Sequence, residues 1–202
     1  MDMLYYEKEA YISNYKLIGG IDEAGRGPLA GPVVAACAVM PLDDIIEGVD
    51  DSKKLTEKTR ERLYGLICEK AISYAVAEVD NETIDRINIL NATKRAMLKA
   101  VKSVTVKPDV LLIDAVKLNS EITVCPIIKG DGLSYSIAAA SILAKVYRDK
   151  LMAKYAEQYP EYGFEKHKGY GTPEHIAALK ALGATPIHRK TFIRNFIGED
   201  NE

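Results

Sequence analysis

Residues 33–40, Val-Val-Ala-Ala-Cys-Ala-Val-Met, form a run in which every side chain is apolar. Successive side chains of a strand point to opposite faces of a sheet, so such a strand must be covered on both faces. The run therefore predicts a central strand of a sheet that has helices on both sides. Further strands are predicted at residues 16–22, 72–79, 110–114 and 122–128. Helices are predicted at residues 55–70, 82–104, 134–157 and 172–183.

Residues that favour helix ends support these boundaries. Thr56, Ser134 and Thr172 stand where helical patterns begin, and a hydroxyl oxygen there can accept a backbone N–H of the first turn. Pro173 and Gly183 bracket the last helix in the usual order. Because helices alternate with strands after the first two strands, the predicted fold class is α/β, with a mixed central sheet flanked by helices.

Length and composition favour one globular domain: the chain has 202 residues, of which 48% are hydrophobic and 28% charged. The three cysteines are widely spaced, which argues against a zinc site or a disulfide framework and predicts buried, reduced thiols. The N-terminal segment lacks the order of a signal peptide, and no apolar run approaches the roughly 20 residues of a membrane span. We therefore expect a cytoplasmic protein without a membrane anchor.

The net charge of −2 does not by itself indicate a nucleic-acid partner. The charge is unevenly distributed, however. Residues 145–195 carry ten basic and five acidic side chains, whereas residues 41–90 carry seven basic and twelve acidic ones. A basic region on a nearly neutral chain is compatible with a local phosphate-binding surface, although ordinary solvated faces show the same imbalance.

Four carboxylates stand at the ends of predicted elements, where an acid is a poor structural choice. Asp22 and Glu23 end the first strand, before a glycine-rich turn. Asp114 ends the strand Val-Leu-Leu-Ile-Asp, and Asp131 lies between two glycines ahead of an alanine-rich helix. Strand ends gather at one edge of an α/β sheet, so acids from different strands can converge there. Clustered carboxylates repel one another unless cations separate them, and oxygen ligands favour Mg²⁺ or Mn²⁺.

Two such ions about 3.5–4 Å apart can activate a water molecule and stabilise the leaving oxygen of a phosphodiester. The simpler alternative is that each acid is a turn or cap residue. That alternative is weakest for Asp22 and Glu23, because consecutive strand side chains point to opposite faces. Both side chains reach one site only if the backbone turns there, and Gly25 and Gly27 permit such a turn.

The glycines around Arg26 also suggest a phosphate-binding loop of the dinucleotide-binding or P-loop type. Their spacing matches neither motif, and an apolar β-branched run follows instead of a helix. Glycines beside an arginine can serve differently. They let backbone amides approach a phosphate or sugar closely, while the guanidinium contacts phosphate.

Residues 20–34, Gly-Ile-Asp-Glu-Ala-Gly-Arg-Gly-Pro-Leu-Ala-Gly-Pro-Val-Val, resemble the signature of the ribonuclease HII family. Supporting resemblances follow in order at residues 51–55, 112–115, 138–149 and 167–172. The resemblance implies the ribonuclease H-like fold, with a mixed five-stranded sheet and a helical C-terminal extension. We accordingly expect a catalytic domain at residues 1–160 and the extension at residues 161–202.

The resemblance also implies the reaction. The family cleaves the RNA strand of RNA–DNA hybrids and nicks on the 5′ side of a ribonucleotide embedded in duplex DNA, leaving 3′-hydroxyl and 5′-phosphate ends. It uses two Mg²⁺ or Mn²⁺ ions and serves ribonucleotide removal in DNA replication and repair. The metal ligands that it implies here are Asp22, Glu23, Asp114 and Asp131.

Substrate-binding residues follow from the same resemblance. Gly25, Arg26 and Gly27 correspond to the element that senses the 2′-hydroxyl, and Tyr170 to a tyrosine that stacks on the substrate. Lys53 corresponds to a phosphate-contacting lysine, with the adjacent Lys54 as an alternative. Arg26 between the glycines favours type HII over the related type HIII.

Other polar residues are given structural interpretations. We expect Asp149 to form an ion pair with Arg148, and His167 and His188 to be ordinary surface histidines. No clamp-binding motif is evident after Phe196, and we expect a monomer. Two other functions remain in competition: a different nuclease of the same general fold, such as a resolvase, and a catalytically silent hybrid-binding protein. The complete set of acids disfavours the second, and Arg26 disfavours the first.

Overall fold

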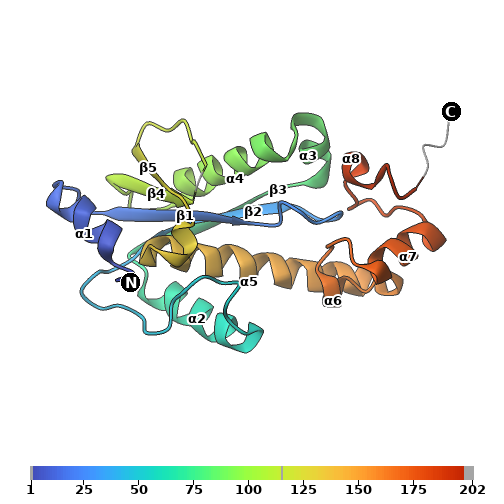
Figure 1. The fold of residues 1–202 in the computed structure, drawn as a ribbon, viewed down its shortest axis with the longest axis horizontal. Coiled ribbons are helices and arrows are strands. Elements are labelled where there is room, and N and C mark those ends of the chain that lie inside the picture. Colours follow the sequence, from blue (N-terminus) through green and yellow to red (C-terminus); the bar gives the residue numbers. More distant parts are fainter. Residues whose placement is uncertain (1, 115, 198–202) are drawn as a thin grey trace.

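A computed structural model of the chain describes residues 2–114 and 116–197. Its core is a five-stranded sheet in the order β3-β2-β1-β4-β5 (Figure 1). The strands are β1 (Ile18–Ala24), β2 (Val33–Val39), β3 (Ser73–Val79), β4 (Val110–Asp114) and β5 (Thr123–Ile127). β2 pairs antiparallel with β1 and β3, whereas β4 pairs parallel with β1 and β5. The predicted mixed sheet is therefore confirmed.

Helices cover both faces of the sheet, as the apolar sequence of β2 requires. They are α1 (Tyr5–Ile12), α2 (Glu57–Lys70), α3 (Asn81–Ile87), α4 (Ile89–Ser103), α5 (Tyr135–Gln158), α6 (Phe164–His167), α7 (Pro173–Leu182) and α8 (Lys190–Ile193). Two short 3₁₀ helices are η1 (Gly130–Gly132) and η2 (Pro160–Tyr162). Val33, Ala35 and Cys37 of β2 join the core cluster that contains the buried face of α4. Val34, Ala36 and Ala38 join the cluster formed by α2 and α5 on the opposite face.

The alanine-rich half of α5 lies very close to β1. A Cβ atom added at Gly20 would lie only 2.0 Å from the backbone carbon of Ser136, so glycine is required there. Small side chains at Ala138, Ala139 and Ala140 are all fully buried in this contact region. The close approach places the first turns of α5 directly beside the strand that carries Asp22 and Glu23.

Most predicted helix starts are confirmed, with one correction. Thr56, Ser134 and Thr172 each accept a backbone N–H of the following turn. The single helix predicted at residues 82–104 is in fact two helices, α3 and α4. They break at Asn88, which adopts a positive φ of 65° and caps α4 by accepting the backbone N–H of Asn91. The helices α1, α6 and α8 were not predicted.

Several other expectations concern the chain ends and the thiols. Cys37 is buried as predicted, but Cys68 is half-buried and Cys125 is exposed. Within the described part of the chain, no helix is long and apolar enough to cross a membrane. Ala115 of the resembling segments and residues 198–202, on which the prediction about a clamp-binding motif partly rests, lie outside the described residues.

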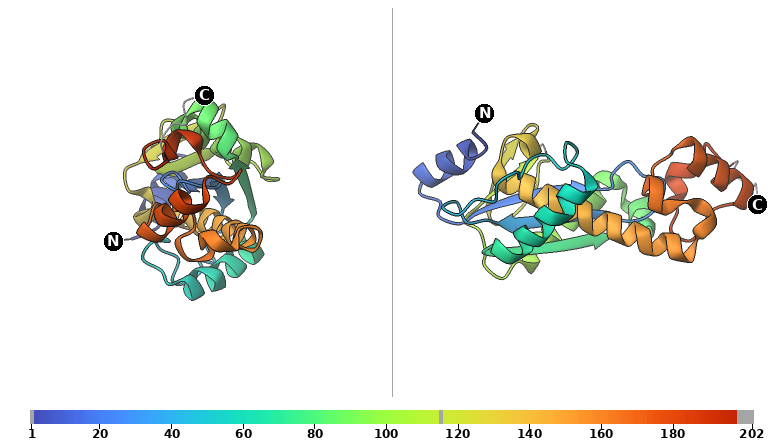
Figure 2. Two further views of the ribbon diagram at one scale, coloured as in Figure 1. Left: turned by 90° about the vertical axis from the view of Figure 1, so that its right-hand side faces the viewer. Right: turned by 90° about the horizontal axis from the view of Figure 1, so that it is seen from below.

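The C-terminal helices pack at the far end of α5, beyond the edge of the sheet (Figure 2). An aromatic cluster holds them together, in which Phe164 contacts the rings of His167, His175 and His188. The interpretation of His188 as a surface histidine is wrong, because only 2% of the residue is exposed. His167 is half-buried and bonds through Nε2 to the carbonyl oxygen of Tyr162.

His175 and His188 form a buried pair, with their Nε2 atoms 3.0 Å apart. One ring must donate and the other accept, so the pair cannot exist with both rings protonated. Burial and the neighbouring His175 lower the pKa of His188 from 6.5 to about 4. Burial also lowers the pKa of His175. The folded protein therefore holds both rings in the neutral form at neutral pH.

Because the pKa values of both histidines are lowered, we expect the free energy of unfolding to decrease in acid. A depressed pKa contributes stability that is fully present above the unfolded value near 6.5 and is lost as pH falls toward about 4. For His188 the loss is on the order of 3 kcal/mol. Replacing His188 with Gln should therefore make the free energy of unfolding fall less between these pH values than it does in the wild type. Urea titrations at intermediate pH values measure the difference, and equal slopes for the two proteins would contradict the assignment.

Candidate active site

Asp22 and Glu23 lie near the end of β1, within its regular pairing with β2. Pairing continues to Ala24, and the backbone turns only at Gly25, which has a φ of 94°. The turn thus begins at Gly25, within the predicted glycine segment, and the two acids themselves still belong to the strand. Asp22 is buried, with 5% of the residue exposed, and Glu23 is half-buried.

The electrostatic environment of Asp22 is unfavourable for a carboxylate without a cation. Burial raises its pKa well above the usual range, and the charges of Glu23 and Asp114 raise it further. A hydrogen bond with Ser141 of α5 opposes these effects. Burial likewise raises the pKa of Glu23, against the opposing effect of Arg26, whose Nη1 lies 3.3 Å from Glu23 Oε1. Asp22, Glu23 and Asp114 thus interact through their charges.

Asp114 and Asp131 are linked through the backbone that joins β4 and β5 to α5. The N–H of Gly130 donates to Asp114 Oδ1 at 2.9 Å, and Asp131 follows in η1. Asp131 is buried, and its Oδ2 lies 2.8 Å from the ammonium of Lys53. Asp131, and to a smaller degree Asp22, raise the pKa of Lys53. Lys53 therefore connects Asp131 electrostatically to the other acids.

The two candidate lysines are clearly distinguished by their partners. Lys53 bonds to Asp131 within the acidic centre, although most of its side chain is exposed. Lys54 instead bonds to Asp50, at 3.0 Å, on an exposed part of the same loop. Of the two, only Lys53 makes a hydrogen bond with one of the four acids.

The residues of this centre fit divalent cations by their chemistry. All candidate donors are carboxylate oxygens, which hard cations prefer. Glu23 Oε2 is buried and lacks a hydrogen-bond partner among the described residues, so this oxygen can serve as a metal ligand. The side chains do not yet form a closed ligand set, because no three acidic, histidine or cysteine side chains in the described residues converge closely enough. One oxygen of Asp131 is bound by the ammonium of Lys53.

The glycine loop and Tyr170 are neighbours, although 143 positions separate Gly27 from this tyrosine in the sequence. A Cβ atom added at Gly27 would lie 3.6 Å from Cε1 of the Tyr170 ring. Tyr170 is 45% exposed, so part of its ring remains available to a ligand. The structure thus brings together the predicted 2′-hydroxyl element and the predicted stacking residue.

Two buried arginines hold this loop, and sequence reasoning missed both roles. Arg148 donates to the carbonyl oxygens of Ala30 and Pro32, and through Nη1 to that of Lys168. Arg189 donates to the carbonyl oxygens of Gly25, Arg26 and Gly31. Neither guanidinium forms an ion pair with a carboxylate in the described part of the chain.

The structure corrects two expectations about these arginines: that the basic charge of the C-terminal region faces a ligand, and that Arg148 pairs with Asp149. Burial lowers the pKa of Arg148 to about 10 and that of Arg189 to about 9. The basic charge of the C-terminal region is therefore partly internal and does not all face a ligand. Asp149 does form an ion pair, but its partner is Lys145, at 2.6 Å, and not Arg148. A basic stretch in a sequence gives no signal that its arginines bind backbone carbonyls.

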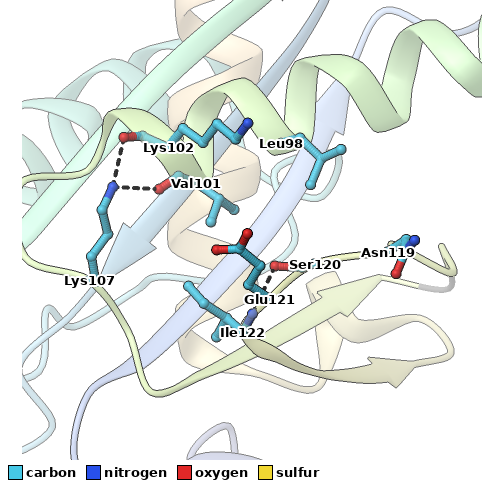
Figure 3. A pocket seen from close by; sticks show the side chains of 8 residues that line it. All are labelled: Leu98, Val101, Lys102, Lys107, Asn119, Ser120, Glu121 and Ile122. Carbon is cyan, nitrogen blue, oxygen red and sulfur yellow. Dashed lines mark hydrogen bonds between the residues drawn. The ribbon is translucent and has the colours of Figure 1, made fainter.

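Several pockets of the described residues are lined by none of the four acids. A pocket of about 380 Å³ between α4 and the segment before β5 is lined by Leu98, Lys107 and Ile122, among others (Figure 3). None of the four acids lines it. The acidic centre lies among the end of β1, η1 and the loop that carries Lys53.

Comparisons with known proteins agree with this arrangement. A family model described as Ribonuclease HII matches residues 19–195. Ribonuclease HII of Acetivibrio thermocellus is 57% identical over 198 residues, which cover 98% of this chain and 77% of that protein.

Solved structures give the same result. Ribonuclease H2 from Pyrococcus horikoshii OT3 superposes with a TM-score of 0.76 at 31% identity, covering 90% of this chain and 97% of that one. A chain in the structure of the PCNA:RNase HII complex from Archaeoglobus fulgidus superposes with a TM-score of 0.75 at 26% identity, covering 89% and 96%. The chain therefore belongs to the ribonuclease HII family and is a ribonuclease H that hydrolyses the RNA of RNA–DNA hybrids.

Proposed function

We propose that this ribonuclease works by two-metal catalysis at the acidic centre. The ligands in this proposal are Asp22, Glu23, Asp114 and Asp131. The observation that carries it is the grouping of buried acids around Asp22, whose charges repel one another, with Arg26 paired to Glu23 and Lys53 paired to Asp131. When bound, Mg²⁺ or Mn²⁺ would supply activation of a water molecule and charge stabilisation at the leaving oxygen.

Lys53 has a dual role in this proposal. Its ammonium compensates the charge of Asp131 in the structure, at 2.8 Å. Metal binding at Asp131 would make that compensation unnecessary. Because most of the Lys53 side chain is exposed, the ammonium could then contact a phosphate of the substrate.

The glycine loop and Tyr170 would recognise the ribonucleotide. DNA and RNA phosphates are alike, so discrimination requires a group that meets the 2′-hydroxyl. Backbone groups of Gly25, Arg26 and Gly27 suit this role, because glycine permits close approach. Arg148 and Arg189 would keep the loop in one conformation by holding five of its carbonyl oxygens.

With Tyr170 stacked on the following deoxyribose, this recognition would direct a nick to the 5′ side of a ribonucleotide embedded in DNA. The products would carry 3′-hydroxyl and 5′-phosphate ends. We assign the chain a role in removing ribonucleotides during DNA replication and repair, as a cytoplasmic monomer. Residues 161–202 would act as a C-terminal extension of a catalytic domain at 1–160. Ile187 and Phe164 of this extension pack against Ala30 of the loop, which supports its role as an extension packed on the catalytic domain.

Asp22→Asn should abolish cleavage while leaving hybrid binding largely intact. Losing one charged ligand removes charge stabilisation worth several kcal/mol, on the order of 10³-fold or more in rate. Cleavage of a duplex with a single embedded ribonucleotide measures the loss. A second readout is independent of activity: MnCl₂ should raise the Tm of the wild type, because the ion binds the folded state, but should raise that of the variant less. Activity above about a tenth of wild type would contradict the assignment.

Asp131→Asn and Asp149→Asn form a matched pair. Both acids are buried and each bonds to a lysine, but only Asp131 belongs to the proposed ligand set. Asp131→Asn should therefore lose activity on the order of 10³-fold, whereas Asp149→Asn should change mainly stability. Parallel measurements of kcat and Tm distinguish them. An inactive Asp149→Asn beside an active Asp131→Asn would show that the fourth ligand is misassigned.

Tyr170→Ala should weaken cleavage at a single embedded ribonucleotide more than cleavage within continuous RNA, where the following sugar is not a deoxyribose. Stacking on aromatic side chains is worth about 1–3 kcal/mol, or roughly 5- to 160-fold. The measurement is the ratio of kcat/KM on the two substrates. Tyr170→Phe, which keeps the ring, should retain the wild-type ratio. If the alanine variant also retains it, Tyr170 does not recognise the junction.

A further inference from the structure

Glu7 of α1 is a buried carboxylate that the proposed chemistry does not use. It lies outside the segment matched by the family, which begins at residue 19. None of its surface is exposed, and Oε1 accepts the hydroxyl of Ser134 at 2.6 Å and the N–H of Ser136 at 2.9 Å. Oε2 is buried and has no hydrogen-bond partner among the described residues.

Glu7 lies where a hydrogen-bond acceptor is favoured. Its carboxylate lies at the N-terminus of α5, a helix of 24 residues, where the helix dipole favours negative charge. Burial raises the pKa of Glu7, and the bonds from Ser134 and Ser136 oppose that shift. The segment before α1 adds a backbone contact, because the N–H of Tyr135 donates to the carbonyl oxygen of Met3 at 2.8 Å. The first turn of α5 is thus held from outside by the N-terminal segment.

A continuous chain of hydrogen bonds leads from Glu7 to the acidic centre. Ser134 donates its hydroxyl to Glu7. It also donates its backbone N–H to the carbonyl oxygen of Gly130 at 2.9 Å. Gly130 in turn donates its N–H to Asp114 Oδ1 at 2.9 Å. Asp131 is the next residue along η1. Two of the four proposed metal ligands are therefore connected to Glu7 through one short turn.

We propose that Glu7 is a positioning residue for catalysis, which holds the first turn of α5 and η1 so that Asp114 and Asp131 are placed for metal binding. This inference rests on the proposed two-metal function. Glu7 touches neither the reacting atoms nor the proposed ligands, so its effect passes through Ser134 and Gly130. Loss of the carboxylate leaves the Ser134 hydroxyl and the Ser136 N–H without their acceptor and frees the turn to move.

The test compares Glu7→Ala, Glu7→Asp and Glu7→Gln with Glu9→Ala, a control at an exposed glutamate of the same helix. Two quantities are measured for each protein: the steady-state kcat and KM on a duplex with one ribonucleotide, and the MnCl₂ concentration at which Tm rises half-maximally. Glu7→Ala should lower kcat by roughly tenfold with little change in KM, and should raise the MnCl₂ midpoint by a similar factor. Glu7→Gln, whose amide oxygen can accept both bonds, should stay near wild type.

The outcomes separate this inference from the proposed function. If Glu7→Ala lowers Tm but leaves kcat and the MnCl₂ midpoint unchanged, Glu7 is only structural and the inference is overturned. If Glu7→Ala does not fold, Glu7→Asp decides, because its shorter side chain keeps the charge but should reach the turn poorly and raise the midpoint. An unchanged midpoint in a folded Glu7→Asp would then overturn it. A wild type whose Tm does not respond to MnCl₂ would instead contradict the two-metal proposal itself.

Discussion

The close contact between β1 and α5 is the constraint on which the active site depends. Gly20 allows the helix backbone to approach the strand, and this approach buries Asp22 beside Ser141. A buried carboxylate surrounded by other acids is costly unless a cation compensates it. The fold accepts that cost at the point where the ends of β1 and β4 meet. The same helix begins just after η1, so its position also determines where Asp131 lies.

The lysine and arginine side chains around this centre fall into two groups, which differ in their partners. Lys53 and Arg26 are partly exposed and form ion pairs with Asp131 and Glu23 at the edge of the site. Arg148 and Arg189 are internal and bond to backbone carbonyls, so their charges fix the shape of the glycine loop. The rigid loop therefore depends on α5 and on the C-terminal segment together. This dependence explains why the C-terminal elements pack on the loop rather than standing apart from it.

Sequence patterns predicted most of the sheet and helices, because alternation, apolar runs and caps are local signals. Asn88 shows the limit: a single residue at positive φ divides one apolar helical pattern into two helices. The helix α1 was missed because its main anchor is Glu7, a polar residue whose burial depends on a turn more than a hundred positions away. Similarly, the sequence places Arg148 beside Asp149, but α5 directs their side chains to different partners.

The sequence by itself determined the family, the strand ends that carry the acids and the glycine loop, since each is a short segment with its own signature. Only the tertiary structure decided which groups meet. It placed Lys53 rather than Lys54 against Asp131, and it placed Tyr170 beside Gly27. The physical reason is that contacts between distant segments are set by how the helices pack on the sheet. Spacing along the chain carries no record of that packing.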